Sequence, residues 1–382
     1  MICRIGHSTR NTQPRLQCAG DRARSLPVRG ADKDRALREA LGKSESTMTT
    51  ETTPVQFRMV RYPHAGQVDG VWSMTRDPLP ELRDDEVTVR MSHLSVDPGM
   101  RGWITPKRSY MPPVQPGEVM RAFGVGEVVE SRSERLKVGD WVTGFTGVQT
   151  FANLPANGLR AIRPDLAPPH LFLSGLGMTG YTAYFGVTDI GRPQPGETMV
   201  VSAAAGAVGA IACQVGRIQG ARVVGIAGGP AKRAFLLEEL KVDAAIDYKA
   251  GDIAHQLAVA APDGIDVYFD NVGGEILDAA LAQINRHGRI VVCGGISQYG
   301  DMDLVRGPSN YLQLIAQSAR MQGFTMRDYI DRIPEAFMAL AGWRGAGKLI
   351  FREHVVKGIE RFPEAFDMLF VGANNGKLLI EV

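Results

Sequence analysis

The residues best able to do chemistry in this chain lie in a run of small side chains between two apolar segments. Ala204, Gly206 and Gly209 occupy the three positions of a Gly-x-Gly-x-x-Gly turn, with Ala in place of the first Gly. Such a turn lets the backbone approach a pyrophosphate and directs the free N–H groups of the following helix at the anion. The spacing alone is a weak signal, because small residues also serve packing at tight turns. It predicts a dinucleotide site formed by Ala204, Gly206, Ala207, Val208 and Gly209.

Two cations follow the next predicted strand, at a place where many dinucleotide sites carry an acid. Residues 222–237 contain no Asp or Glu, but they do contain Lys232 and Arg233. An acid here binds the ribose hydroxyls of NAD, whereas cations suit the 2′-phosphate of NADP. The alternative is that both residues begin a solvated helix, although cations are slightly unfavourable there. We predict NADP(H) as the cofactor, with Gly228 and Lys232 in its site.

The sequence shows no set of metal ligands. Its four cysteines form no Cys-x-x-Cys pair, and its seven histidines stand singly. A zinc site needs several such ligands at close spacing, so we predict that no metal is bound. Alcohol oxidation is then disfavoured, because nothing helps to remove the hydroxyl proton. Reduction of an activated C=C bond is favoured, since hydroxyl or backbone donors can stabilise the charge that moves to a carbonyl oxygen.

Two patterns of elements must position these residues. Residues 55–163 contain several short alternating segments with turns between them, which is typical of an antiparallel, barrel-like β domain. From about residue 171, apolar strands alternate with amphipathic helices, which indicates a parallel sheet covered on both faces. A helix is expected over 328–341, and the tail becomes β-like again from Leu349. The strand candidates of the parallel sheet are 198–202, 222–226, 244–246, 265–270, 289–293 and a last one starting at Met321.

The composition of the chain narrows the classes of molecule that the protein is expected to bind and the compartment in which it is expected to work. The 382 residues carry a formal net charge of +2, which gives no general attraction to nucleic acid or to anionic membranes. No apolar run reaches the roughly 18–20 residues that a membrane span needs. Cysteine usage fits a reducing compartment, so we expect a cytoplasmic protein. Residues 1–47 are Arg-rich but also contain acids, unlike a transit peptide. We expect them to be disordered, or to precede a true start at Met48.

A long collinear series of motifs gives the chain a family resemblance. From Met48 to Val382 it resembles the zinc-independent medium-chain dehydrogenases/reductases, in the branch of NADP-dependent alkenal/one oxidoreductases that includes the prostaglandin reductases. The Gly-His-Glu element of the zinc-dependent relatives is missing. The matching segments are residues 94–101, 177–186, 203–209, 247–249, 268–274, 289–297, 320–324 and 374–377.

The resemblance implies an α/β protein with a GroES-like, barrel-type β catalytic domain and a Rossmann domain with a doubly wound parallel sheet. The catalytic domain would take residues 48–171 and regain 346–382, and residues 172–345 would bind NADP(H). We also expect a homodimer, because this fold commonly extends its sheet through an edge strand.

Roles for single residues follow from the same resemblance. Lys232 and Tyr248 match positions that hold the adenosine 2′-phosphate. Asn271 matches a position that lines the cofactor channel, and Asn374 one that reaches the cofactor from the C-terminal tail. One departure is Gly228-Gly229-Pro230, which stands where the family often has Gly-Ser, so a serine contact to the phosphate is lost.

Tyr299 and Tyr311 match positions near the nicotinamide end. Tyr311 is the better candidate to donate a hydrogen bond to the ribose or to the substrate oxygen, because a phenol stays protonated at neutral pH. The alternative for Tyr311 is a packing role on a helix. Arg101 is expected to orient its own loop rather than to touch substrate. The apolar candidates for the substrate pocket are Met100, Trp103 and Tyr110.

These observations lead to one main hypothesis and two alternatives. The main hypothesis is an NADPH-dependent reductase of the C=C bond of α,β-unsaturated ketones and aldehydes. The first alternative is an NADPH quinone oxidoreductase of the same superfamily. The second is an NADPH-binding structural or regulatory protein with little turnover. The expected partner is a small enone, alkenal or quinone, with no role for nucleic acid or membrane.

Overall fold

A computed structural model describes residues 53–64, 66–107, 109–300 and 304–382. The expectations for residues 1–47 lie outside this part of the chain. Among the described residues, no helix combines the length and the apolar character that crossing a membrane requires.

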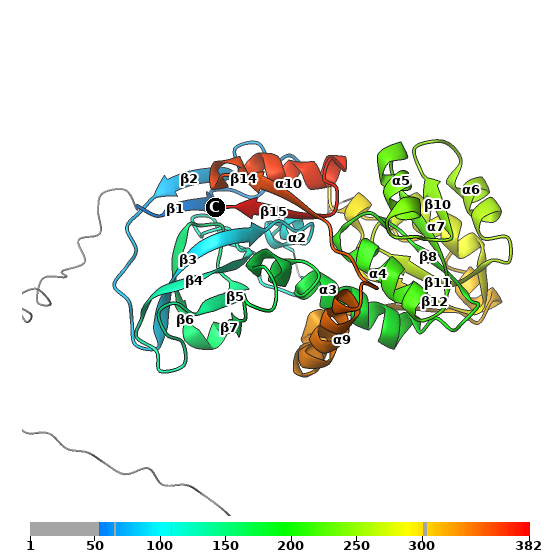
Figure 1. Ribbon diagram of the computed structural model, residues 1–382. Helices are drawn as coiled ribbons and strands as arrows, with labels where there is room; N and C mark the ends of the chain where they lie inside the picture. The colour runs from blue at the N-terminus through cyan, green and yellow to red at the C-terminus, as the bar shows by residue number, and fades with distance from the viewer. Residues whose placement is uncertain (1–52, 65, 108, 301–303) are drawn as a thin grey trace, which may run out of the picture. The chain divides into compact units, whose positions relative to one another are not determined.

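A seven-stranded sheet contains most of the β-rich first part of the chain. The strand order is β14-β15-β3-β4-β5-β7, and β6 pairs with β3. Every pair is antiparallel except β14 with β15. The C-terminal segment therefore completes the sheet begun by the N-terminal strands (Figure 1). The strands are β3 (Glu86–Ser95), β4 (Phe123–Ser131), β5 (Trp141–Phe145), β6 (Phe151–Pro155), β7 (Leu159–Ile162), β14 (Glu353–Lys357) and β15 (Lys377–Glu381); β1 (Val55–Met59) and β2 (Trp72–Arg76) form a separate hairpin.

The two glycines of β4, Gly124 and Gly126, lie where other segments of the chain come close. A Cβ on Gly126 would lie 2.2 Å from the carbonyl oxygen of Arg90 on β3. The pairing of β3 with β4 also shifts register twice along its length. Only a residue without a side chain fits such a close approach, so these glycines allow β3 and β4 to bend around the core of the sheet.

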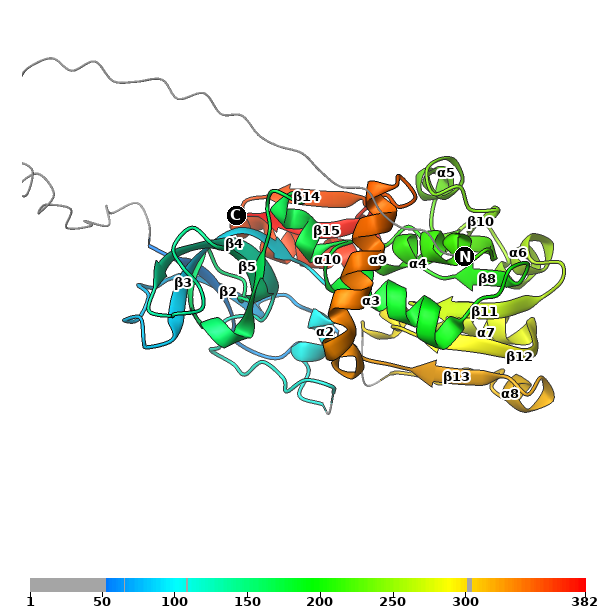
Figure 2. The same cartoon turned by 60° about the horizontal axis from the view of Figure 1, so that its bottom comes forward.

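The second half forms a six-stranded sheet in which every pair is parallel, with the order β10-β9-β8-β11-β12-β13. Helices cover both faces (Figure 2), so the predicted α/β fold with a doubly wound sheet is confirmed. The strands are β8 (Thr198–Val201), β9 (Arg222–Ala227), β10 (Ala244–Asp247), β11 (Ile265–Asp270), β12 (Ile284–Val292) and β13 (Arg320–Gly323).

Alternate residues of each strand pack on opposite faces of this sheet. In β8, Met199 and Val201 join the core cluster that contains residues of α4, whereas Val200 joins the cluster that contains residues of α6 and α7. This period of two explains why the centre of β8 is apolar on both faces of the sheet. The helices of this half are α3 (Met178–Phe185), α4 (Ala207–Ile218), α5 (Pro230–Glu238), α6 (Ile253–Ala260), α7 (Gly274–Ala282), α8 (Gln313–Ala316) and α9 (Ile333–Gly345), and α2 (Met100–Trp103) and α10 (Phe362–Val371) belong to the other half.

Two predicted elements begin later than expected. The α-helix predicted over 328–341 begins at Ile333 and follows a 3₁₀ segment, Met326–Arg332. Pro334 explains the shift, because proline is tolerated only in the first turn of a helix. The strand predicted from Leu349 begins at Glu353. Before it, the backbone of Ile350 pairs with the amide of Gln214 on α4, at 2.8 and 3.0 Å, instead of with a strand.

Candidate active site

The carboxyl ends of the parallel strands meet at one edge of the six-stranded sheet. The chain leaves β8 toward β9 on one side and reaches β11 on the other, so β8 and β11 border the topological switch point. Ligands of open α/β sheets bind outside the strand ends at this point. The segments that follow β8, β9, β11 and β12 are therefore where a dinucleotide is expected.

The turn after β8 leaves the first turn of α4 open. Gly206 is the N-cap residue of α4, with extended backbone and no side-chain cap. A Cβ on Gly209 would lie 2.3 Å from the carbonyl oxygen of Ala203, so the helix can pack here only with glycine. Ala204 takes the first motif position without strain, because its buried N–H donates to the carbonyl of Ile226 at 2.9 Å. The N–H groups of Ala207, Val208 and Gly209 are in the first helical turn, which is the part of a helix that attracts anions.

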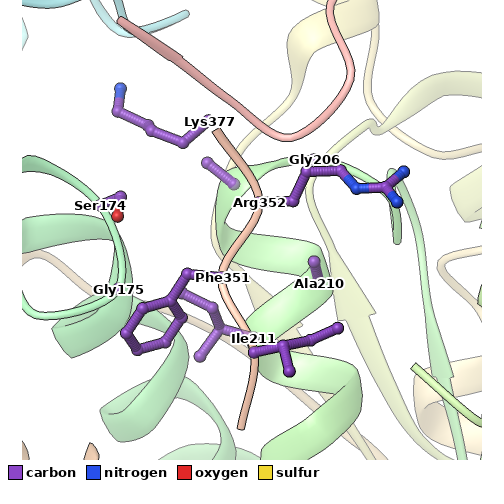
Figure 3. Close-up of a pocket in the computed structure, with 10 residues that line it drawn as sticks. Ser174, Gly175, Gly206, Ala210, Ile211, Phe351, Arg352 and Lys377 are labelled. Atoms are coloured by element: carbon purple, nitrogen blue, oxygen red, sulfur yellow. The ribbon is translucent and has the colours of Figure 1, made fainter. Parts of the chain in front are cut away.

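The C-terminal segment reaches this turn. Gly206 forms an isolated parallel bridge with Gly376. Asn374 lies two residues before Gly376 and donates its side-chain amide to that residue's carbonyl oxygen at 2.9 Å. A small pocket lies beside the turn, and Figure 3 shows Phe351 against Gly175 there and Arg352 directed away from Lys377. The predicted site residues Gly206 and Asn374 are thus brought close together.

A cluster of two lysines and a tyrosine lies at the ends of β9 and β10. A Cβ on Gly228 would lie 2.8 Å from the Tyr248 ring and 3.0 Å from the side chain of Lys249. The ammonium of Lys249 lies 6.0 Å from the centroid of the Tyr248 ring. Burial, and the positive charge of Lys249, lower the pKa of Lys232. Two cations whose charges act on each other in this way suit a doubly charged anion. We call Lys232, Tyr248 and Lys249 the lysine cluster.

The side chains of Lys232 and Arg233 donate hydrogen bonds to carbonyl oxygens in different parts of the fold. The ammonium of Lys232 donates to the carbonyl oxygen of Gly372, at the end of α10, at 2.9 Å. The guanidinium of Arg233 donates to the carbonyl oxygen of Ala245 on β10 at 3.0 Å. Lys232 therefore belongs to the cluster, whereas Arg233 turns toward the strand.

The lowered pKa of Lys232 predicts a pH effect on cofactor binding. Lysine binds phosphate only when protonated, so its contribution is lost as the pH rises through that pKa. We expect kcat/KM for NADPH to fall on the alkaline side at a lower pH than an ordinary lysine would give. The value for NADH should not show this fall. Lys232→Arg should remove it, because guanidinium stays protonated. A fall of the same size for NADH, in steady-state kinetics across pH, would contradict the assignment.

A buried carboxyl organises the switch point. Asp270, at the end of β11, accepts hydrogen bonds on Oδ1 from Ser202, Tyr268 and the backbone N–H groups of Val272 and Gly273, at 3.0–3.1 Å. Burial raises the pKa of Asp270, although the two backbone N–H groups oppose the shift. Its Oδ2 has no hydrogen-bond partner among the described residues.

Asn271 follows Asp270 and is fixed in turn. Its amide donates to the carbonyl oxygen of Ser202 at 2.7 Å, and its backbone N–H donates to the Ser202 hydroxyl at 2.8 Å. The structure thus ties the predicted cofactor residue Asn271 directly to the end of β8, beside the glycine turn.

Tyr299 lies at the same edge, beyond the end of β12. Its hydroxyl accepts a hydrogen bond from the N–H of Gly295 at 3.2 Å, which leaves its own proton free for another acceptor. Burial raises the pKa of Tyr299, so its phenol stays protonated at neutral pH. Electrostatic interactions with Cys293, Tyr110 and Asp270 raise the pKa of Tyr299 further.

The structure does not bring Tyr311 to this edge. Tyr311 is 56% exposed and leads into α8. Helix α8 lies at the amino end of β13 (Figure 2), whereas Tyr299 follows the carboxyl end of β12. The neighbouring Asn310 is held to Asp278 on α7 by two hydrogen bonds of 2.9 Å. Within one chain, the surface position of Tyr311 does not suit the donor role expected of it.

The apolar candidates divide into core and surface. Met100 is fully buried and Trp103 is 4% exposed, so both serve the core of the β-rich half. The hydroxyl of Tyr110 accepts a hydrogen bond from the indole N–H of Trp103 at 3.1 Å. Tyr110 is 48% exposed, and of the three it is the one available to a ligand.

Two family models match the chain. A model described as the N-terminal domain of oxidoreductase matches residues 55–162, and one described as zinc-binding dehydrogenase matches residues 207–342. The chain belongs to the medium-chain dehydrogenases/reductases. Despite the name of the second model, no three His, Cys, Asp or Glu side chains are grouped for a metal ion within the described residues.

Similar proteins indicate the branch. The chain is 40% identical over 325 residues to the NADPH-dependent curcumin reductase of Escherichia coli, covering 84% of this chain and 94% of that one. It is 38% identical to a 2-alkenal reductase (NADP⁺-dependent) of Nicotiana tabacum, covering 80% and 89%. The crystal structure of CurA in complex with NADPH from Vibrio vulnificus is 38% identical, with a TM-score of 0.82 over 86% of this chain and 99% of that one. The predicted zinc-independent, NADP-dependent family is confirmed.

Sequence reasoning did not select two residues that the structure places at the strand ends. Lys249 lies in the matching segment 247–249 and was given no role, yet it belongs to the lysine cluster. Asp270 lies in the matching segment 268–274 and was given no role, yet its carboxyl accepts hydrogen bonds from the loop that follows Asn271. A lysine directly after Tyr248 was a usable signal for the first. Nothing in the sequence distinguishes a buried Asp270 from an exposed one.

Proposed function

We propose that this oxidoreductase reduces the C=C bond of α,β-unsaturated ketones and aldehydes with NADPH. The lysine cluster beside the open turn of α4 is the observation that carries the cofactor assignment. The cluster offers two cations whose charges act on each other, which fits a 2′-phosphate. The names of the curcumin and 2-alkenal reductases support the substrate class, since both act on conjugated carbonyl compounds or alkenals.

The residues of the chain would share the work as follows. The first turn of α4 and Gly206 hold the pyrophosphate, and Lys232, Tyr248 and Lys249 hold the 2′-phosphate. When bound, NADPH supplies a hydride to the β-carbon of the substrate. Negative charge then moves to the carbonyl oxygen. Tyr299 donates its phenolic hydrogen bond to that oxygen, because the N–H of Gly295 already occupies one of its lone pairs. A proton added at the α-carbon completes the saturated product.

A substrate panel tests the proposal. Purified protein is mixed with NADPH and with enones, alkenals or quinones, and NADPH oxidation is followed. We expect enones and alkenals to be reduced, with the label from deuterated NADPH found at the β-carbon of the product. Preference for quinones would favour a quinone oxidoreductase, and tight NADPH binding without oxidation would favour a structural or regulatory role. Either result would overturn the proposal.

Treatment with a chelator gives a separate prediction. We expect EDTA or phenanthroline, followed by gel filtration, to leave the reductase rate unchanged, because the proposed chemistry relies on hydrogen-bond donors rather than on a metal. Loss of the rate, with recovery on adding zinc, would refute the zinc-free mechanism. Metal analysis of the untreated protein provides the control.

We also propose a homodimer. Strand β13 is at the end of the parallel sheet, and three of its four residues, Arg320, Gln322 and Gly323, are exposed. The unpaired edge of such a strand can pair with a second copy. Light scattering should give twice the chain mass of 41.4 kDa. A single-chain mass across the concentration range would exclude the dimer.

A further inference from the structure

Arg101 is a buried arginine whose guanidinium is held by backbone carbonyls. It is 5% exposed and lies in α2, the short helix that follows β3. Its Nε donates to the carbonyl oxygen of Tyr299 at 3.3 Å, and its Nη2 donates to that of Gly300 at 3.2 Å and to that of Gly66. These acceptors come from two segments far apart in sequence. Arg101 therefore joins the β-rich half to the loop that carries Tyr299.

The two joined segments also touch each other directly. Gly66 has a φ of +77°, and a Cβ on it would lie 2.3 Å from the carbonyl oxygen of Gly300. Any side chain at position 66 would push the loop of Tyr299 away, whatever the backbone strain. The contact at Gly66 depends on the same loop position that Arg101 holds.

The base of α2 is anchored by an ion pair between a buried lysine and a partly buried aspartate. Lys377 is 2% exposed, and its ammonium donates to Asp97 Oδ1 at 2.6 Å and to the carbonyl oxygen of Val96 at 3.0 Å. The carbonyl oxygen of Asp97 in turn accepts the N–H of Met100 at 3.0 Å, at the start of α2. The residue before Lys377 is Gly376, which bridges to the glycine turn at Gly206.

Lys377, Asp97 and Arg101 thus form a continuous series of contacts from the glycine turn to Tyr299. We call these three residues the brace. Residues 94–101 and 374–377, the two motifs that contribute Asp97, Arg101 and Lys377, matched the family, but these three residues had no part in the cofactor assignment.

We propose that Arg101 is a positioning residue that fixes Tyr299 relative to the glycine turn. The inference rests on the proposed function for the role of Tyr299. Without Arg101, the carbonyls of Tyr299 and Gly300 lose their donor, and the loop can move away from the nicotinamide end. The cost should fall on the catalytic step, since Arg101 makes its contacts at the loop of Tyr299 and not at the glycine turn or the lysine cluster.

Hydrogen–deuterium exchange tests the proposal without any turnover. We expect Arg101→Met to speed exchange in a peptide covering residues 294–300 while leaving exchange in β8 and α4 unchanged. Arg61→Met is the matched control, because the Arg61 guanidinium also donates to backbone carbonyls, those of Asp69 and Gly70, but within its own hairpin. Exchange in 294–300 that stays at the wild-type rate in Arg101→Met would overturn the proposal, even if the protein reduces no enone.

A double-mutant cycle tests whether Arg101 acts through Tyr299. We expect Arg101→Met to lower kcat about 10- to 100-fold, a loss typical of a hydrogen bond to a charged group, with little change in KM for NADPH. In a Tyr299→Phe background the same change should cost much less. Arg101→Lys should restore part of kcat. The cycle uses whichever enone, alkenal or quinone the panel finds active, so its result does not depend on the substrate class.

Fully additive losses in that cycle would overturn the role of Arg101 in positioning Tyr299. If Arg101→Met does not fold, Gly66→Ala replaces it, since that change separates the same two segments without removing a charge. It should give the same rise in exchange at 294–300 and the same fall in kcat. Thermal unfolding of each variant shows whether it is folded.

Discussion

We expect Lys232→Ala to weaken NADPH binding about 10- to 100-fold and to leave NADH binding within about twofold. The ammonium lies in the lysine cluster, where burial and the positive charge of Lys249 already lower its pKa. A 2′-phosphate relieves this repulsion and accepts charge-assisted hydrogen bonds, which NADH cannot. Lys249→Ala should act in the same direction, and the double variant should bring the two cofactors near equal affinity.

Fluorescence titration with each cofactor measures these affinities. Arg233→Ala is the matched control, because Arg233 is the adjacent cation on α5 but donates to the carbonyl of Ala245 on β10. It should leave the preference for NADPH intact. Equal losses for NADPH and NADH in Lys232→Ala would refute the role of Lys232 in holding the 2′-phosphate.

The second large effect is expected at the glycine turn, where Gly209→Ala should damage both stability and cofactor binding. The added Cβ would lie 2.3 Å from a backbone oxygen of Ala203, so the start of α4 must move. Forcing extra volume into such a contact costs about 1–3 kcal/mol. The displaced N–H groups of the first turn then no longer converge on the pyrophosphate, so NADPH affinity should fall at least about 100-fold.

Gly206→Ala separates these two effects. Its Cβ would lie 3.1 Å from the carbonyl oxygen of Ala203 and near no other atom, so the fold can adjust. We expect a change of less than about 1 kcal/mol in unfolding free energy, but weaker NADPH binding, because a methyl group stands where the pyrophosphate approaches. Denaturant unfolding and NADPH titration measure both quantities. Undiminished NADPH affinity in Gly206→Ala would exclude the turn as the pyrophosphate site.

The spacing of apolar residues was sufficient to predict the two sheets and their order of strands and helices along the chain, because that spacing follows directly from which side chains are buried. Strands buried on both faces have apolar centres, as residues 199–201 of β8 and 267–269 of β11 do. The predicted start of the helix over 328–341 was wrong because Pro334 is a local signal for the first turn of a helix, and α9 begins at Ile333. Sequence reasoning also failed where a partner lies far along the chain. Nothing near Ile350 indicates that its backbone will pair with the side chain of Gln214.

The candidate site also contains residues that the sequence predicts and residues that it does not. The glycine turn and Lys232 could be predicted because strand, turn and charge are adjacent in sequence. The sequence gives no sound basis for choosing between Tyr299 and Tyr311 as the hydrogen-bond donor, although Tyr311 looked the better candidate. Each is a tyrosine in the segment between β12 and β13. Only the fold shows that Tyr299 lies at the carboxyl end of β12, whereas Tyr311 precedes α8 at the amino end of β13. The link from Arg101 to Tyr299 spans nearly two hundred positions, beyond any local pattern.

The bond between Lys232 and the carbonyl oxygen of Gly372 has a consequence for redesign of the cofactor preference. Gly372 ends α10 in the left-handed conformation, and Lys232 supplies a donor to its carbonyl from the nucleotide-binding half. A phosphate that recruits the ammonium must compete with this internal acceptor, so the measured affinity reflects an exchange of partners. Truncating Lys232 to favour NADH would therefore also leave the end of α10 without its donor. A side chain that keeps a neutral donor, such as Gln, would remove the charge without removing this tether.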